Sequence, residues 1–253
     1  MVGLLLAAQL ARAAPQLLPN EKTLSVPSRP GATISFLALS PQTPPRAGVI
    51  LFAGGDGIIG NNQQNFLLRV RGQFAAAGFL VVSLGMPSDH RDGLNAKTRS
   101  APDYAQDVAA TIAWMRQHGA DRIWLIGTST GTISAANAAS RLKPGTVDGL
   151  VMTSSFVPTP GGSAPPIDTW VSLPSVAVPT LFVHNREDAC ATSPFANLQR
   201  LIDEFRHAPV KDLIAVSGGA PPTSGPCDAM SRHGYFGLED QVVKDIVSWI
   251  AAH

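Results

Sequence analysis

Short apolar runs that alternate with helical patterns constrain the fold of this chain more than any other feature. Residues 48–53 (GVILFA) and 122–126 (RIWLI) are apolar apart from Arg122, as is typical of strands buried on both faces of a parallel sheet. Around these runs, apolar residues recur at helical spacing over 62–77 and 101–117. Strands that alternate with helices predict an α/β fold, with a mainly parallel central sheet and helices on both faces.

The remaining predicted elements complete this alternation. Further strands are expected at 22–26, 33–39, 79–84, 149–152, 180–183 and 212–216, and further helices at 130–142, 197–205 and 240–252. A turn rich in Pro and Gly at 27–31 separates the first two strands, which are therefore expected to pair antiparallel. The stretch 156–178 is rich in Pro, Gly and Ser and has no helical pattern. We therefore predict no sizeable cap domain, and a functional site covered at most by a loop.

The N-terminal stretch differs in composition from the rest of the chain. Residues 2–10 are almost wholly apolar, and Ala11-Arg12-Ala13 has the small-x-small form of a signal-peptidase site. The stretch is shorter than the roughly 20 residues that a spanning helix needs, and we expect no membrane span elsewhere. These features predict a signal peptide at 1–13, a single domain at 14–253 and a periplasmic or secreted location. Because no basic residue lies near Met1, a misassigned start codon and a short non-secretory helix stay open as alternatives.

Charge and cysteine content exclude several classes of function. Lys and Arg total 19 and Asp and Glu total 18, so the net charge gives no reason to expect nucleic acid or an anionic membrane as partner. The two cysteines, Cys190 and Cys227, make a poor zinc site because no paired histidine motif accompanies them. In an exported protein they suggest one disulfide, whereas two inert thiols are the better expectation for a cytosolic protein.

A candidate nucleophile lies in the sequence Gly127-Thr128-Ser129-Thr130-Gly131, between the run 122–126 and a predicted helix. A serine at such a strand-to-helix turn is exposed at the sheet edge, and the two glycines supply the small neighbours that a crowded turn requires. The amide of Thr130 is expected at the helix N-terminus, where it can stabilise a developing oxyanion. Ser129 is therefore the candidate nucleophile, and the alternative is a purely structural turn.

The chain also contains candidates for the base and the orienting acid that a nucleophilic serine needs. Asp188 follows the predicted strand at 180–183 and is the candidate acid, with Glu187 as the alternative. His233 lies beside Gly234 in a loop before the last helix, and it is the candidate base. The chain order serine, acid, histidine is the one expected with a strand–turn–helix elbow of this type.

A glycine-rich turn, Gly54-Gly55-Asp56-Gly57, follows the run 48–53. Glycine lets the backbone approach a ligand closely, so the Gly55 amide is the candidate second oxyanion donor. The Asp56 amide is the alternative if the donor lies one residue further along the turn. The turn lacks the G-x-G-x-x-G pattern, and no Lys-Ser or Lys-Thr follows it, so we do not expect nucleotide binding. The alternative is a tight turn with only a structural role.

Together these motifs resemble the α/β-hydrolase superfamily over nearly the whole chain after the leader. The resemblance rests on GTSTG around Ser129, HNREDAC around Asp188 and RHGYFGLED around His233. It is closest to small, capless bacterial members of the esterase and dienelactone-hydrolase-like kinds. The chain departs from many members in reading Ala53-Gly54 where they have His-Gly. The resemblance implies hydrolysis of a carboxylic ester through an acyl-enzyme on Ser129, with no metal and no organic cofactor, but it does not fix a substrate.

The sequence defines the substrate and the partners less well. Trp170, in the Pro-rich stretch after 149–152, could line an acyl or aromatic subsite, or it could anchor its own loop. The expected partner is a small-molecule or polymeric ester, and the oligomeric state is undefined. Two other functions stay open: an exported, non-catalytic binding module with this fold, and an acyltransferase that uses the same triad.

Overall fold

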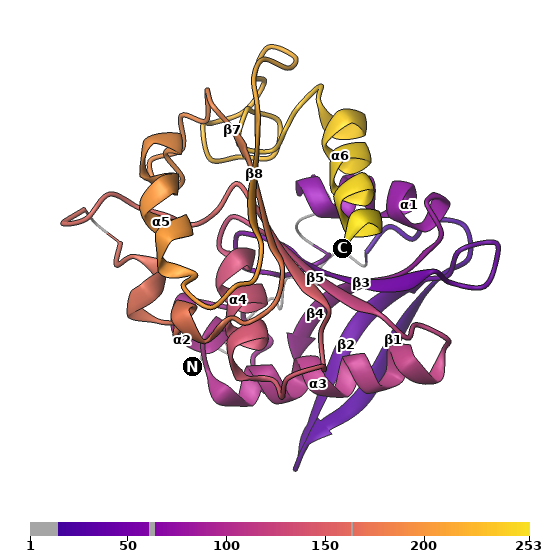
Figure 1. The fold of residues 1–253 in the computed structure, drawn as a ribbon. Coiled ribbons are helices and arrows are strands. Elements are labelled where there is room, and N and C mark those ends of the chain that lie inside the picture. The colour runs from indigo at the N-terminus through magenta and orange to yellow at the C-terminus, as the bar shows by residue number, and fades with distance from the viewer. Residues whose placement is uncertain (1–14, 61–63, 163) are drawn as a thin grey trace, which may run out of the picture.

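The computed structural model describes residues 15–60, 64–162 and 164–253. The predicted signal peptide at 1–13 therefore lies outside the described residues. In the described part of the chain, an eight-stranded sheet forms the central layer, with the strand order β1-β2-β4-β3-β5-β6-β7-β8. Helices lie on both faces of this sheet (Figure 1). The predicted α/β architecture is confirmed.

Each predicted strand is present, with ends that differ by a few residues. The strands are β1 (Glu21–Arg29), β2 (Ala32–Leu39), β3 (Ala47–Phe52), β4 (Phe79–Pro87), β5 (Ile123–Thr128), β6 (Gly149–Thr153), β7 (Thr180–Asn185) and β8 (Lys211–Val216). The pairs β1–β2 and β2–β4 are antiparallel, and β4–β3, β3–β5 and the pairs from there to β8 are parallel. The carboxyl ends of the parallel strands therefore share one edge of the sheet, where reactive groups gather in such folds.

The helices also follow the predicted order, with one addition. They are α1 (Phe66–Ala76), α2 (Ala96–Arg99), α3 (Pro102–Gln117), α4 (Gly131–Arg141), α5 (Leu198–Glu204) and α6 (Glu239–Ala252). The first helix begins at Phe66 instead of 62 because Asn65 caps it, with its Oδ1 accepting a hydrogen bond from the N–H of Leu67 at 3.1 Å. The sequence gives no sign of α2 because four residues are too few to display a helical period. None of the described helices is long and apolar enough to cross a membrane.

Two apolar cores, one on each face, explain the unbroken apolar runs of the central strands. On β3, Ile50 and Phe52 belong to the cluster that also contains residues of α3, α4 and α5. Val49 and Leu51 belong to the cluster on the other face, with residues of α1 and α6. Because successive strand residues point to opposite faces, a strand covered on both sides has no position for a polar side chain.

The described part of the Pro-rich stretch 156–178 forms no separate cap. It contains two single-turn 3₁₀ helices, η1 (Ile167–Thr169) and η2 (Leu173–Ser175). The side chains of Ile167 and Leu173 are fully buried in the same apolar cluster as those of α4. This segment therefore extends the core layer of one face.

The close pairing of Trp124 with Gly149 provides a test of the packing. The two residues are register partners on β5 and β6, and a Cβ on Gly149 would lie 2.1 Å from Cζ3 of the fully buried Trp124. We expect Gly149→Ala to lower the free energy of unfolding by about 1–3 kcal/mol through overpacking, as measured by urea denaturation. An unchanged urea midpoint would mean that the indole can move aside without cost.

Candidate active site

The turn that carries Ser129 joins β5 to α4, as the sequence predicted. Ser129 adopts a left-handed backbone conformation with a φ of 53°. Packing requires both neighbouring glycines: a Cβ on Gly127 would lie 2.7 Å from the carbonyl oxygen of Gly131, and a Cβ on Gly131 would lie 2.0 Å from that of Phe52. Sparsely populated conformations at non-glycine residues gather at functional sites, so the backbone supports Ser129 as the candidate nucleophile.

Asp188 and His233 form a buried hydrogen-bonded pair. Asp188 lies in the loop after β7, and His233 lies in the loop before α6. Nδ1 of His233 is 2.8 Å from Oδ2 of Asp188, and the N–H of Cys190 donates to Oδ1 at 2.9 Å. The other ring nitrogen, Nε2, is buried and has no hydrogen-bond partner among the described residues. An imidazole that donates from Nδ1 to a carboxylate presents Nε2 as a base.

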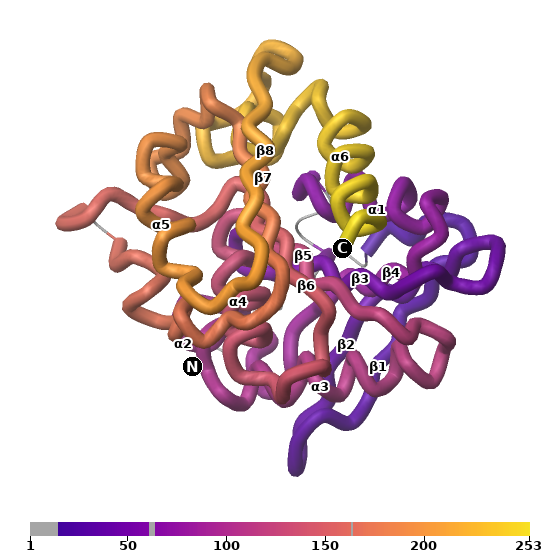
Figure 2. The backbone as a smooth tube through the Cα atoms, viewed as in Figure 1, coloured from indigo at the N-terminus to yellow at the C-terminus, as the bar shows by residue number. Residues whose placement is uncertain are grey.

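A cavity of about 140 Å³ contains both Ser129 and His233 in its lining, together with Gly54, Gly55 and Asn65. Figure 2 shows the chain after β8 folding over the carboxyl ends of β7 and β8 before it enters α6. A larger cavity of about 470 Å³, beside the end of β2 and α1, contains none of the predicted site residues. Within the described ranges, no group of His, Cys, Asp or Glu side chains is arranged to hold a metal ion.

Glu187, the alternative acid, faces away from His233. Its side chain is exposed, with Oε1 accepting a hydrogen bond from the N–H of Gly218 at 2.9 Å and Oε2 lying 3.4 Å from Nε of Arg232. The geometry therefore favours Asp188 as the orienting acid.

Trp170 does not line the described part of this cavity. It follows η1 and packs, partly buried, against the apolar cluster that contains Leu173. Its indole nitrogen is buried and has no acceptor among the described residues. This position supports the role of loop anchor over that of an acyl subsite.

A second histidine reaches Asp188 from the end of β7. His184 is fully buried, and its Nε2 donates to the carbonyl oxygen of Ser193 at 2.8 Å while lying 3.4 Å from Oδ2 of Asp188. Burial by itself would raise the pKa of Asp188, but the neighbouring imidazole of His184 and the hydrogen bonds from His233 and from the N–H of Cys190 hold this pKa below its usual value. The carboxylate is therefore ionised at neutral pH, as the orienter of an imidazole must be.

This lowered pKa predicts a pH-dependent contribution of Asp188 to stability. The ionised carboxylate stabilises the fold above its usual pKa of 3.8, and this contribution is lost as the pH falls through the lower pKa of the folded state. We expect the difference in Tm between the parent and Asp188→Asn to be largest near neutral pH and to narrow below pH 3.8. Glu187→Gln is the matched control, and an equal, equally pH-dependent loss in that variant would contradict the assignment.

Two residues outside the predicted set fix the backbone around His233. The hydroxyl of Ser154 donates to the carbonyl oxygen of His233 at 2.7 Å. The phenol of Tyr235 accepts from the N–H of Ser154 at 2.8 Å and donates to the carbonyl oxygen of Val183 at 2.7 Å. Both Ser154 and Tyr235 have left-handed backbones, with φ of 41° and 56°. The sequence carries no motif for these contacts, because they join the end of β6 to the histidine loop.

The glycine turn after β3 is held by a buried arginine. Arg99, the last residue of α2, donates from Nη2 to the carbonyl oxygens of Ala53 at 3.2 Å and Gly55 at 3.1 Å. The hydroxyl of Thr130 donates to the same Gly55 oxygen at 3.1 Å, so a hydrogen bond links the two predicted oxyanion donors. Burial lowers the pKa of Arg99. At the glycine turn, its hydrogen-bond acceptors are the two backbone carbonyl oxygens just named. Sequence reasoning missed Arg99 because it lies in the unpredicted α2.

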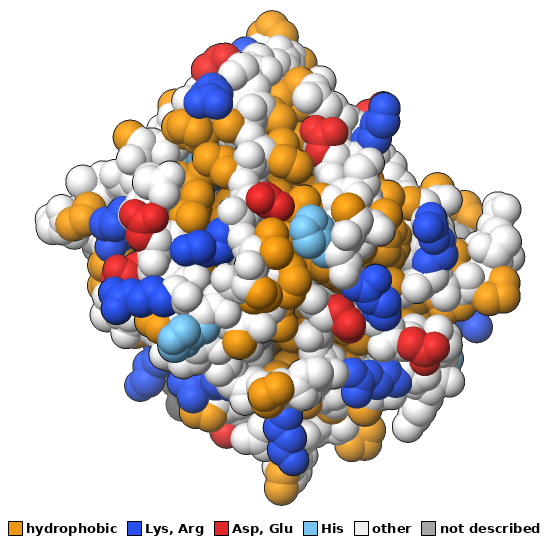
Figure 3. Space-filling view, in the orientation of Figure 1, with side chains coloured by type: hydrophobic (Ala, Val, Ile, Leu, Met, Phe, Trp, Pro, Cys, Tyr) orange, Lys and Arg blue, Asp and Glu red, His pale blue; other side chains and the backbone are white. Residues whose placement is uncertain are grey.

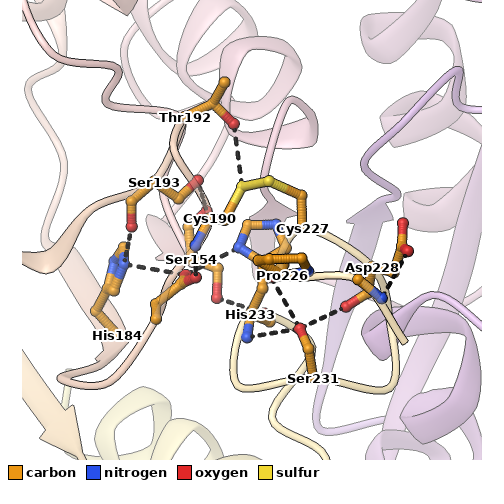
Figure 4. The surroundings of a disulfide bond; sticks show 12 residues. Ser154, His184, Cys190, Thr192, Ser193, Pro226, Cys227, Asp228, Ser231 and His233 are labelled. Atoms are coloured by element: carbon orange, nitrogen blue, oxygen red, sulfur yellow. Dashed lines mark hydrogen bonds and ion pairs between the residues drawn. A yellow bond between two sulfur atoms is a disulfide. The ribbon is translucent and has the colours of Figure 1, made fainter. Parts of the chain in front are cut away.

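A disulfide joins the loop of the candidate acid to that of the candidate base. Cys190 and Cys227 are bonded, at a sequence separation of 37, as the sequence suggested for an exported protein. Cys190 follows Asp188 closely, and Cys227 lines the cavity with His233. Figure 4 shows the bridge lying beside His233.

Removal of this bridge is expected to lower stability. In the chain-entropy model, closing a loop of this length stabilises the fold by about 4 kcal/mol, less any strain. We expect the double variant Cys190→Ser/Cys227→Ser to unfold at a lower urea concentration than the parent. A thiol reductant should bring the parent to the same midpoint and leave the variant unchanged. A reductant effect of equal size on both proteins would contradict this account.

The mainly parallel sheet and the strand–turn–helix elbow at Ser129 are features of serine hydrolases of the α/β-hydrolase class. The family model described as serine aminopeptidase, S33, matches residues 43–209. The match covers more than half of the chain, and the chain therefore belongs to this family. A search of curated proteins found no match.

Solved structures with the same fold include several esterases. The protein Est1E of Butyrivibrio proteoclasticus superposes with a TM-score of 0.64 and 11% sequence identity, over 91% of this chain and 98% of that one. An esterase of Pyrococcus furiosus has a TM-score of 0.60 and 16% sequence identity, over 81% of this chain and 88% of that one. A provisionally named dienelactone hydrolase from Klebsiella pneumoniae has a TM-score of 0.64 and 14% sequence identity, over 92% of this chain and 98% of that one. At these identities the likeness establishes the fold, in agreement with the small, capless type predicted.

Proposed function

We propose that this serine hydrolase is a carboxylesterase that uses Ser129, Asp188 and His233 as a catalytic triad. The observation that carries the proposal is the pairing of Nδ1 of His233 with Asp188 at 2.8 Å while Nε2 stays without a partner among the described residues. His233 and Ser129 line one cavity at the carboxyl edge of the sheet. A base without a protein partner beside a strained serine is the arrangement that nucleophilic catalysis needs.

The proposed reaction has two steps. The Ser129 hydroxyl attacks the ester carbonyl carbon and gives its proton to Nε2 of His233, and Asp188 stabilises the imidazolium that forms. The same proton then passes to the departing alkoxide, which leaves as the alcohol. In the second step, His233 takes a proton from water as the water attacks the acyl-enzyme, and returns it to Ser129 as the acid leaves. No metal or organic cofactor takes part.

The amides of Gly55 and Thr130 are the proposed donors to the oxyanion. The turn at Gly55 is held by the guanidinium of Arg99, and the hydroxyl of Thr130 binds the same turn. Donors that are fixed before the reaction lose no energy to reorganisation when negative charge develops on the substrate. A buried cation behind the turn adds to that stabilisation.

The cavity supports a small, neutral ester as substrate. A volume of about 140 Å³ suits a short acyl group, and no Lys or Arg is among the described residues that line it. The face shown in Figure 3 carries Lys and Arg interspersed with Asp and Glu. The accessible ester of a polymer would also fit an uncapped site.

We further propose a single domain over 14–253 and, from the disulfide, a periplasmic or secreted location.

Hydrolysis of p-nitrophenyl acetate, butyrate and octanoate, beside Ser129→Ala, tests the proposal. We expect the parent to prefer acetate or butyrate, because the cavity is small, and the variant to lose activity by at least about 10³-fold. Leucine p-nitroanilide is included because the family model is described as a serine aminopeptidase. Faster cleavage of the anilide would favour a peptidase, and transfer to added alcohols in place of hydrolysis would favour an acyltransferase. Equal background rates in parent and variant would favour a non-catalytic binding module.

A further inference from the structure

The side chain of Asn65 lies at the catalytic cavity and has no part in the reaction described so far. It stands at the start of α1, immediately before Phe66, and lines the cavity together with Ser129 and His233. As the N-cap of α1, its Oδ1 accepts a hydrogen bond from the N–H of Leu67 at 3.1 Å. This bond fixes the plane of the carboxamide, so the direction of the nitrogen is fixed as well.

The amide nitrogen of Asn65 faces the space above the glycine turn. A Cβ built on Gly54 would lie 3.6 Å from Nδ2 of Asn65 and 2.9 Å from Cβ of Ser129. The nitrogen and the nucleophile therefore border the same small volume, which stays open because Gly54 has no side chain. Among the described residues, no group accepts a hydrogen bond from this nitrogen.

We propose that Asn65 is a further catalytic residue, whose Nδ2 donates a hydrogen bond to the oxyanion of the tetrahedral intermediate. The inference rests on the proposed esterase function and adds a side-chain donor to the amides of Gly55 and Thr130. A neutral amide suits this role because it stabilises developing negative charge without neutralising it by proton transfer. The helix cap holds the donor in place before the substrate arrives.

Two substitutions separate the proposed donor from the helix cap. Asn65→Ser retains a capping oxygen and removes the amide, and Asn65→Asp retains both the capping oxygen and the shape but replaces the donor by a carboxylate. We expect both variants to fold with a Tm close to that of the parent. For p-nitrophenyl acetate, kcat should fall by roughly 10²-fold in Asn65→Ser and by at least as much in Asn65→Asp, as for other oxyanion donors, with KM little changed.

An inhibitor supplies a readout that a purely structural role would not move. An alkylboronic acid forms a tetrahedral, negatively charged adduct with a serine nucleophile, so its affinity for Asn65→Ser should fall in parallel with kcat. Asn65→Ala, which lacks both the cap and the amide, should lose stability as well as activity. If Asn65→Ser restores the stability but not kcat, the donor role stands. If it restores both, Asn65 is only a cap and the inference fails while the esterase function stands. A parent without esterase activity overturns both.

Discussion

The contact between the first turn of α4 and the end of β3 is the constraint on which the rest of the site depends. A Cβ on Gly131 would lie 2.0 Å from the carbonyl oxygen of Phe52, so the two backbones touch directly. This approach sets Ser129 against the glycine turn that continues β3, where Gly54 is also too close to Ser129 for a side chain. Ser129 and the glycine turn are therefore neighbours through backbone packing alone.

The loop of His233 has no regular secondary structure of its own, and its position depends on contacts with distant segments. Asp188 holds its imidazole, Ser154 holds its carbonyl group, and the disulfide joins the loop to the segment after β7. Tyr235 adds a hydrogen bond to the end of β7. Each contact removes freedom from the loop, and together they give His233 the defined orientation that the proposed proton transfer requires.

Hydrogen bonds to carbonyl oxygens compensate for the burial of the charged Arg99 side chain. Desolvation lowers the pKa of this guanidinium, and carbonyl oxygens of the glycine turn and of Leu94 offset part of that cost. In return, the turn has a fixed conformation beside Ser129. The same reasoning connects the helix cap at Asn65 to the cavity: one end of the amide stabilises the fold, and the other end is free for a ligand.

The sequence by itself determined the alternation of strands and helices and the turn at Ser129, because apolar periodicity and the need for glycine in a crowded turn are local. It also ordered serine, acid and histidine along the chain, without separating Asp188 from Glu187. Only the tertiary structure favours Asp188, because His233, 45 residues away in sequence, contacts it at 2.8 Å. Arg99 and Asn65 escaped prediction for the same physical reason. Arg99 bonds to the turn after β3 from at least 44 residues away, and Asn65 shares a cavity with Ser129 and His233. Such relations between distant segments leave no periodic pattern or motif in the chain.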